Sequence, residues 1–138
     1  MNVPIINDSG KTKIAIRFKL FKFLIYSESL LFLFEDIIQS IANNNFPFLV
    51  MGKLKKHIIE NPDYNGYNDL IGPIDENLRN SIGHSDYEIT EKTIKYFYYY
   101  KQADKIIMSE ISIESFQNKL LKLSILFNIF CKKLTNPF

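Results

Sequence analysis

Hydrophobic side chains recur along the first half of this chain with the spacing of helices. Residues 13–43 are mostly apolar and too long for a strand, so they predict one long helix or two in sequence. An asparagine run and Pro47 would end this segment. Residues 48–60 then predict an amphipathic helix, ended at Asn61-Pro62, with lysines opposite an apolar stripe of Leu49, Val50, Leu54 and Ile58.

The next apolar set predicts a helix that ends at Gly83. Its members are spaced at helical intervals: Leu70, Ile71, Ile74, Leu78 and Ile82. Gly83 then stands where a left-handed residue would cap the carboxyl end of this helix. Pro73 is expected either in the first turn of the helix or at a kink in a longer one.

The period changes after this helix. Ile94, Tyr96 and Tyr98 alternate with other side chains, and residues 105–108 form a second β-rich run, which together predict a two-stranded hairpin. Ser112 can cap a final helix. That helix would end at Asn136-Pro137 and carry one apolar stripe: Phe116, Leu120, Leu123, Phe127, Phe130 and Leu134. The predicted fold is therefore all-α, a bundle of four to five helices with a small β-hairpin inserted before the C-terminal helix.

Length and composition fit a single domain over residues 1–138. The chain has 46% hydrophobic residues, which is ample material for one core. Its net charge of +2 and pI near 8.5 neither demand nor exclude a polyanionic partner, so any contact with RNA must be local.

The one cysteine and the charges in the apolar segment bear on location. Cys131 has no cysteine partner for an internal disulfide, which favours a reducing compartment. Arg17, Glu28 and other charged residues interrupt the apolar segment well short of a membrane span, and the polar start resembles no signal peptide. We therefore expect a cytoplasmic protein with no membrane partner.

Candidate chemistry is concentrated in residues 79–84, Arg-Asn-Ser-Ile-Gly-His. They hold one of two arginines and one of two histidines in the chain, whereas lysine supplies the other fifteen basic charges. On an ideal helix Arg79 lies about 80° from the core direction, while Asn80 and His84 lie roughly opposite the core and one turn apart. Asn80 could therefore orient the imidazole of His84.

These three residue types suit cleavage of RNA without a metal. Imidazole exchanges protons near neutral pH, so His84 could take the proton of a 2′-hydroxyl or protonate the leaving oxygen. The planar guanidinium of Arg79 could bind two phosphate oxygens, which lysine cannot do with the same geometry. From spacing alone a simpler interpretation stands beside this one: Arg79 pairs with Asp75 or Glu76, and His84 only follows a helix cap.

The stretch LRNSIGHSDYEI resembles the signature of HEPN domains, in which Arg, a polar residue and a His close a helix of an all-α bundle. The resemblance covers roughly residues 50–134, and only its motif is specific. It implies a metal-independent endoribonuclease, a toxin or antiviral defence effector, with Arg79, Asn80 and His84 as site residues. It also implies a homodimer whose two motifs face each other across one cleft.

Four further residues are candidates for RNA binding. Lys53, Lys56 and His57 share a basic helix face that could follow phosphates, although a solvated lysine face is an equal alternative. Tyr87 lies one position later than the tyrosine that accepts AMP in one HEPN subgroup, so its modification stays open. The aromatic run at 96–100 is expected to pack mainly against the helices, with Tyr98 or Tyr99 the most exposed ring.

The leading hypothesis is a HEPN-type endoribonuclease that acts on RNA without a cofactor. No spacing of His, Cys, Asp or Glu in the sequence suggests a metal site, and there is no glycine-rich phosphate loop. Because His84 alone gives one proton-transfer group per chain, a homodimer would supply both an acid and a base. An antitoxin or sensor protein is a candidate further partner. The alternative function is a catalytically silent module that binds RNA or a protein, or serves as a dimerisation scaffold.

Overall fold

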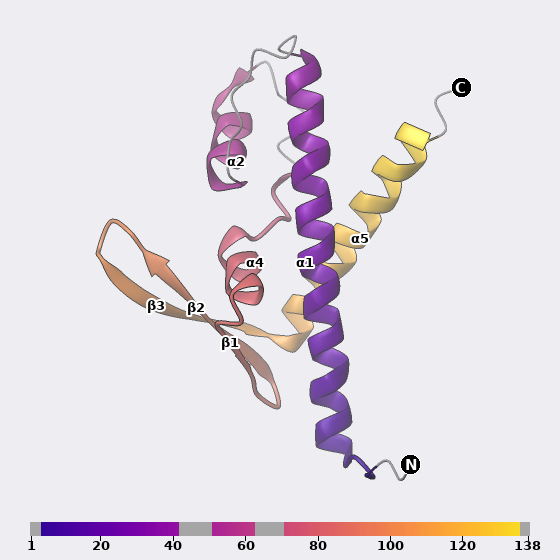
Figure 1. The fold of residues 1–138 in the computed structure, drawn as a ribbon, viewed down its shortest axis with the longest axis vertical. Coiled ribbons are helices and arrows are strands. Elements are labelled where there is room, and N and C mark those ends of the chain that lie inside the picture. Colours follow the sequence, from indigo (N-terminus) through magenta and orange to yellow (C-terminus); the bar gives the residue numbers. More distant parts are fainter. Residues whose placement is uncertain (1–3, 42–50, 63–70, 136–138) are drawn as a thin grey trace.

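The structure, a computed structural model, describes residues 4–41, 51–62 and 71–135. Within these ranges four helices and three strands follow one another along the chain. The helices are α1 (Asp8–Ile41), α2 (Met51–Glu60), α4 (Glu76–Gly83) and α5 (Ile113–Thr135), and the strands are β1 (Tyr87–Ile89), β2 (Thr93–Tyr100) and β3 (Lys105–Ser112). Figure 1 shows α1 running the length of the molecule, with α5 crossing it and α2 and α4 beside it.

The prediction of an all-α fold is wrong. Helices make up 65% of the described residues, but the chain also builds a three-stranded antiparallel sheet in the order β1-β2-β3. The predicted hairpin of β2 and β3 is confirmed, and β1 joins its other side with Tyr87 opposite Tyr96. Ile89 and Ile94 of the sheet are buried in the same core as the helices. The fold is therefore mixed, because side chains of the sheet are part of the core and the sheet does not lie only on the surface of a helical bundle.

Helix α1 supplies much of that core. One face carries buried apolar side chains at helical spacing, among them Ile16, Leu20, Phe23, Phe34 and Ile38. The ring of Phe23 lies 5.7 Å from that of Phe116 on α5, and the ring of Phe34 lies 5.5 Å from that of Phe130. The apolar segment thus forms one helix, not two. No helix in the described ranges is long and apolar enough to cross a membrane.

Helix α5 begins where the sequence indicates. The hydroxyl of Ser112 accepts a hydrogen bond from the backbone N–H of Ser115 at 3.0 Å, which confirms the predicted cap. The predicted stripe is buried at Phe116, Leu123 and Phe130, partly buried at Leu120 and Phe127, and joined by Leu126. The side chain of Leu134 and the predicted stop at Asn136-Pro137 lie outside the described residues.

The two short helices also follow the pattern, with one shifted start. Leu54 and Ile58 of α2 are buried as predicted, whereas Leu49 and Val50 lie outside the described residues, as do Pro47 and Leu70. Helix α4 begins later than expected: the carboxylate of Asp75 accepts from the backbone N–H of Leu78 at 3.0 Å and caps it. Pro73 therefore precedes the helix and neither opens nor kinks it.

The β2–β3 hairpin extends away from the helices (Figure 1). The aromatic run of β2 is divided between the two faces of this hairpin. Ile94 is buried, and Tyr96 and Tyr98 are partly buried on the same side of β2. Phe97 and Tyr99 point to the opposite side and are exposed, opposite Met108 and Ile106 of β3. Only part of the run packs, and Tyr99 is among its most exposed rings.

Candidate functional site

The site begins at the carboxyl end of α4, which closes in a Schellman motif. The backbone N–H of Asp86 donates to the carbonyl of Ser81 at 2.7 Å, and that of Ser85 donates to the carbonyl of Ile82 at 3.1 Å. The left-handed residue is Ser85, with φ of 60°, and not Gly83 as the sequence suggested. Gly83 is the last residue of the helix, and His84 is its cap with φ of −94°.

We expect Ser85→Gly to stabilise the protein by about 0.5–1 kcal/mol, because glycine removes the steric cost of a Cβ in the left-handed region. Chemical denaturation monitored by circular dichroism would measure the change. Ser85→Ala is the matched control, since it keeps the Cβ and should give no gain. A Ser85→Gly protein less stable than the parent would contradict the motif.

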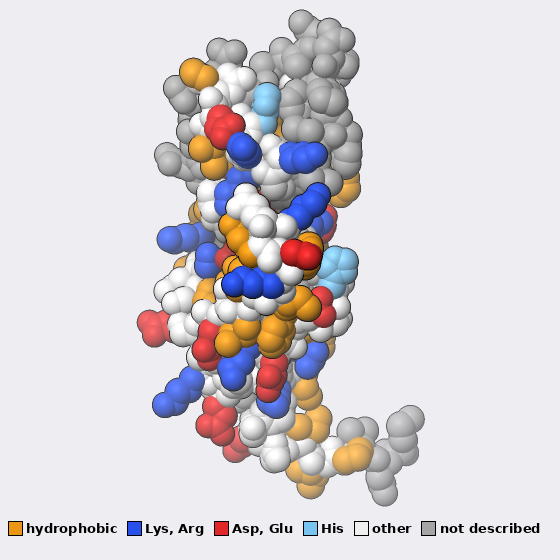
Figure 2. Space-filling view, turned by 90° about the vertical axis from the view of Figure 1, so that its left-hand side faces the viewer, with side chains coloured by type: hydrophobic (Ala, Val, Ile, Leu, Met, Phe, Trp, Pro, Cys, Tyr) orange, Lys and Arg blue, Asp and Glu red, His pale blue; other side chains and the backbone are white. Residues whose placement is uncertain are grey.

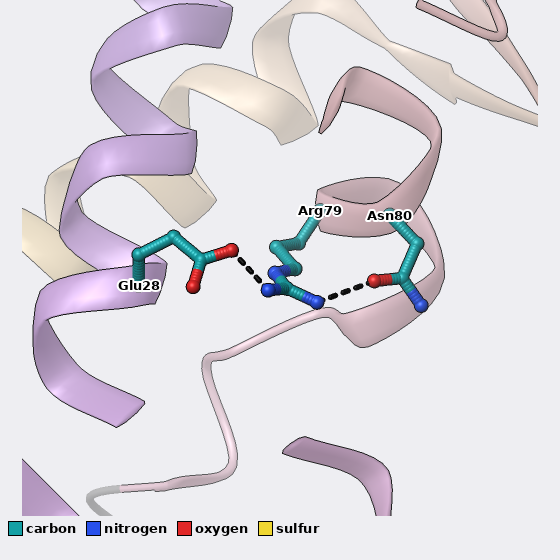
Figure 3. A network of polar contacts seen from close by, with 3 residues as sticks. All are labelled: Glu28, Arg79 and Asn80. Atoms are coloured by element: carbon teal, nitrogen blue, oxygen red, sulfur yellow. Dashed lines mark hydrogen bonds and ion pairs between the residues drawn. The ribbon is translucent and has the colours of Figure 1, made fainter. Parts of the chain in front are cut away.

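Arg79 connects α4 to α1. Its guanidinium forms an ion pair with the carboxylate of Glu28, in the middle of α1, and donates a second hydrogen bond to the side-chain oxygen of Asn80 at 2.5 Å (Figure 3). The partner is neither Asp75 nor Glu76: Asp75 caps α4 and pairs with Lys119 at 3.4 Å. Arg79 is largely buried, with its side chain 22% exposed. Both terminal nitrogens of the guanidinium are therefore engaged within the chain.

This contact fixes which end of the Asn80 amide is available. Arginine has only hydrogen-bond donors, so the Asn80 atom that faces Arg79 must be the carbonyl oxygen. The amide nitrogen, with two N–H groups, then points away from Arg79 (Figure 3). No hydrogen bond joins Asn80 to the imidazole of His84 in the part of the chain that the structure describes. Asn80 is thus positioned by Arg79 and does not itself orient His84.

Asn80 and His84 line one pocket of about 250 Å³ between α4 and β2. Its other walls come from Asn77, Ser81, Asp86 and residues 97–99. Two contacts of Phe97 hold the strand there: its N–H donates to the carbonyl of Asp86 at 2.9 Å, and its carbonyl lies 2.6 Å from the hydroxyl of Ser81. His84 is exposed on this polar wall. The side chains of Asn80 and His84 therefore lie on one concave surface. Arg79 is not part of its lining and contacts Asn80.

Two tyrosines of β2, Tyr96 and, on the pocket wall, Tyr99, have phenols with a raised pKa. Tyr99 donates a hydrogen bond to Asp104, and this bond raises the pKa of the phenol. Burial, with a smaller contribution from the negative charge of Asp75, raises the pKa of Tyr96. Neither phenol is thus an anion at neutral pH, so neither would repel a phosphate.

The other predicted RNA-binding residues do not line this pocket. Lys53, Lys56 and His57 belong to α2, and the ammonium of Lys56 lies 3.9 Å from the carboxylate of Glu60. Tyr87 on β1 accepts a hydrogen bond from Arg17 of α1 at 2.8 Å, and the guanidinium lies 5.4 Å from the centre of the tyrosine ring. Tyr87 therefore has a structural contact, and its role in binding stays a prediction.

The surface around the pocket carries both signs of charge. Figure 2 shows Lys and Arg interspersed with Asp and Glu on the face formed by α2, α4 and the hairpin. Among the described residues, no group of three or more His, Cys, Asp or Glu side chains is placed to hold a metal ion. Any polyanion on this face would be held by local contacts and not by a broad basic field.

Sequence reasoning missed Glu28, Asn77 and Asp86. Glu28 lies 51 residues before Arg79, and no spacing rule relates the two positions. Asn77 is one turn before Ser81 on α4, so the helical period that selected Asn80 and His84 could have found it. Asp86 directly follows the left-handed residue Ser85 and lines the pocket. The sequence predicted the left-handed residue at Gly83, two positions earlier, so it did not indicate where Asp86 lies.

No protein-family model, curated protein sequence or solved structure matches this chain. The resemblance to HEPN domains thus rests on the motif at residues 79–84.

Proposed function

We propose that this protein is a metal-independent endoribonuclease of the HEPN type, a toxin or antiviral defence effector of the cytoplasm. The observation that carries the proposal is the pocket beside α4, where His84 and the amide of Asn80 lie on one polar wall. RNA cleavage by attack of a 2′-hydroxyl on the adjacent phosphorus needs a base for the hydroxyl proton and a donor that stabilises the charge on the phosphate. An imidazole and a fixed N–H donor suit these two tasks.

In the proposed reaction His84 accepts the proton of the 2′-hydroxyl as the 2′-oxygen attacks the adjacent phosphorus. The bond from phosphorus to the 5′-oxygen breaks, and that oxygen takes a proton from a general acid. The products are a 2′,3′-cyclic phosphate and a free 5′-hydroxyl. The amide of Asn80 donates to a non-bridging oxygen, where negative charge grows in the transition state.

Arg79 has a supporting part in this proposal. Because its guanidinium is engaged with Glu28 and Asn80, it acts as a positioning residue that fixes the amide of Asn80. Direct contact of Arg79 with a phosphate stays a prediction, since it requires the ion pair with Glu28 to open. A homodimer would add the general acid from a second His84, and an antitoxin or sensor protein remains a proposed further partner.

The proposal is tested by incubating the purified chain with a labelled single-stranded RNA in excess EDTA. Cleavage at an undiminished rate is expected, with cyclic phosphate ends on the products. An oligonucleotide of the same sequence made entirely of DNA is the control and should stay intact, because it lacks the 2′-hydroxyl. Cleavage that EDTA abolishes and Mg²⁺ restores, or cleavage of the DNA, would rule out this mechanism.

A catalytically silent module is the second candidate, and the burial of Arg79 favours it. A guanidinium committed to Glu28 and Asn80 stabilises the packing of α4 on α1 whether or not RNA is bound. In that case the motif would be structural, and the chain would bind RNA or a protein without cutting it. Absence of cleavage in the same assay, with binding retained, would support this second function.

A further inference from the structure

Helix α1 carries a second apolar face that the described residues of the chain leave uncovered. Ile14, Phe18, Phe21, Ile25 and Phe32 are between 43% and 68% exposed, although other faces of α1 are packed against α4 and α5. Five large exposed hydrophobic side chains on one helix face are typical of an interaction surface.

The spacing of this seam, as we call these five residues, indicates what covers it. They follow one another at intervals of four, three, four and seven residues, and Glu28 occupies the position that would divide the last interval. Alternating steps of three and four are the heptad pattern by which one helix packs along another. From Ile14 to Phe32 the seam is about 27 Å long. The fitting partner is therefore another long helix.

The charges beside the seam select that partner and its direction. After Asp8, the charges at the surface of the N-terminal half of α1 are all basic: Lys11, Lys13, Arg17, Lys19 and Lys22. In the C-terminal half they are acidic, Glu28 and Asp36, whereas Glu35 is buried. Two parallel copies of α1 would place like charges together. Two antiparallel copies place the basic half of each along the acidic half of the other.

We propose that the seam is the interface of an antiparallel homodimer formed by two copies of α1. In the register that brings apolar positions together, Phe21 of one copy faces Ile25 of the other, and Ile14 faces Phe32. Phe18 then lies against Glu28, so the Glu28–Arg79 ion pair is covered by the second copy. A charge that is already paired tolerates this burial better than a free one.

The direction of the pairing also decides where the two candidate sites lie. The two-fold axis of an antiparallel pair passes between the two helices, perpendicular to the plane that contains them, so α4 of each copy stays on the same side of that plane. In a parallel pair the axis lies between the helices and runs parallel to them, which places the two α4 helices on opposite sides of the plane. The antiparallel dimer thus allows both His84 residues to serve one RNA; this last step rests on the proposed function, whereas the dimer does not.

Light scattering and sedimentation of the full chain at micromolar concentration test the interface. The parent should have the mass of a dimer, and Ile25→Asp should raise the dissociation constant by about 30-fold or more, as expected for a central interface side chain. Leu121→Asp is the matched control on α5, exposed to a similar degree, and should remain dimeric. Circular dichroism confirms that each variant is folded. A monomeric parent, or a dimer that Ile25→Asp leaves intact, would overturn the proposal.

Cysteine cross-linking tests the direction in a Cys131→Ser background. Under mild oxidation a mixture of Phe21→Cys and Ile25→Cys chains should form a disulfide-linked pair, whereas Ile25→Cys alone should not. Cross-linking of Ile25→Cys alone would establish a parallel pair and overturn the proposed register, as would no cross-linking in the mixture. A dimer that passes both tests but cuts no RNA would retain the interface and refute only the proposed function.

Discussion

Replacing His84 with alanine is expected to slow RNA cleavage by about 10²–10⁴-fold, the contribution typical of one positioned acid or base. The expectation follows from the place of the imidazole on the wall of the pocket, beside the amide of Asn80. The side chain is exposed, and the structure gives it no hydrogen bond that the substitution would break within the described residues. The rate of single-turnover cleavage of a labelled RNA would measure the effect.

Asn128→Ala offers a matched control, because Asn128 is an exposed polar residue on α5 and is not part of the pocket. It should cleave like the parent. Thermal melting of both variants should also be unchanged. A His84→Ala protein that retains the parental rate would remove the histidine from the mechanism, even if cleavage itself were metal-independent.

Replacing Leu123 with alanine should destabilise the fold by about 2–5 kcal/mol, since a fully buried leucine leaves a cavity when it is truncated. Leu123 is 0% exposed on α5, whereas Leu121, two residues earlier on the same helix, is 59% exposed. Leu121→Ala is therefore the matched control and should change the free energy of unfolding by no more than about 0.5 kcal/mol. Urea denaturation of the three proteins would measure both values, and equal losses would contradict the observed orientation of α5.

Periodicity predicted the elements that bury a continuous stripe. Leu78 and Ile82 of α4, Leu54 and Ile58 of α2, and Phe116 of α5 are all buried where the helical spacing placed them. The capping serine at 112 was identifiable because its chemistry is local. Strand β1 was missed since three residues are too few to show an alternating pattern. The fold is mixed because β1 completes a three-stranded sheet and because Ile94 of that sheet is buried in the core.

The candidate site was predictable only in part, because its decisive contacts are not local. The outward direction of Asn80 and His84 followed from the helical phase, and the structure places both on one pocket. The partner of Arg79 did not follow, since Glu28 belongs to a distant helix. The turn after α4 was misplaced because glycine is the usual left-handed residue, and here Ser85 adopts that conformation instead.

Both arginines of the chain connect α1 to another element of the fold. Arg17 of α1 holds Tyr87 of β1, and Arg79 of α4 holds Glu28 of α1. Each contact uses the planar guanidinium, over a ring in one case and between two oxygens in the other. A lysine at either position would keep the charge and lose this geometry. The arginines therefore attach the elements that flank the pocket to the long helix.

The two contacts of Phe97 have a consequence for local unfolding. Its N–H and its carbonyl both bind the segment that carries His84, through Asp86 and Ser81. If β2 separates from α4, the turn after the helix loses these partners at the same moment. The hairpin and the end of α4 should then open and close as one cooperative unit, with a single opening free energy. The pocket would thus be either complete or absent, and a partly formed version would be scarcely populated.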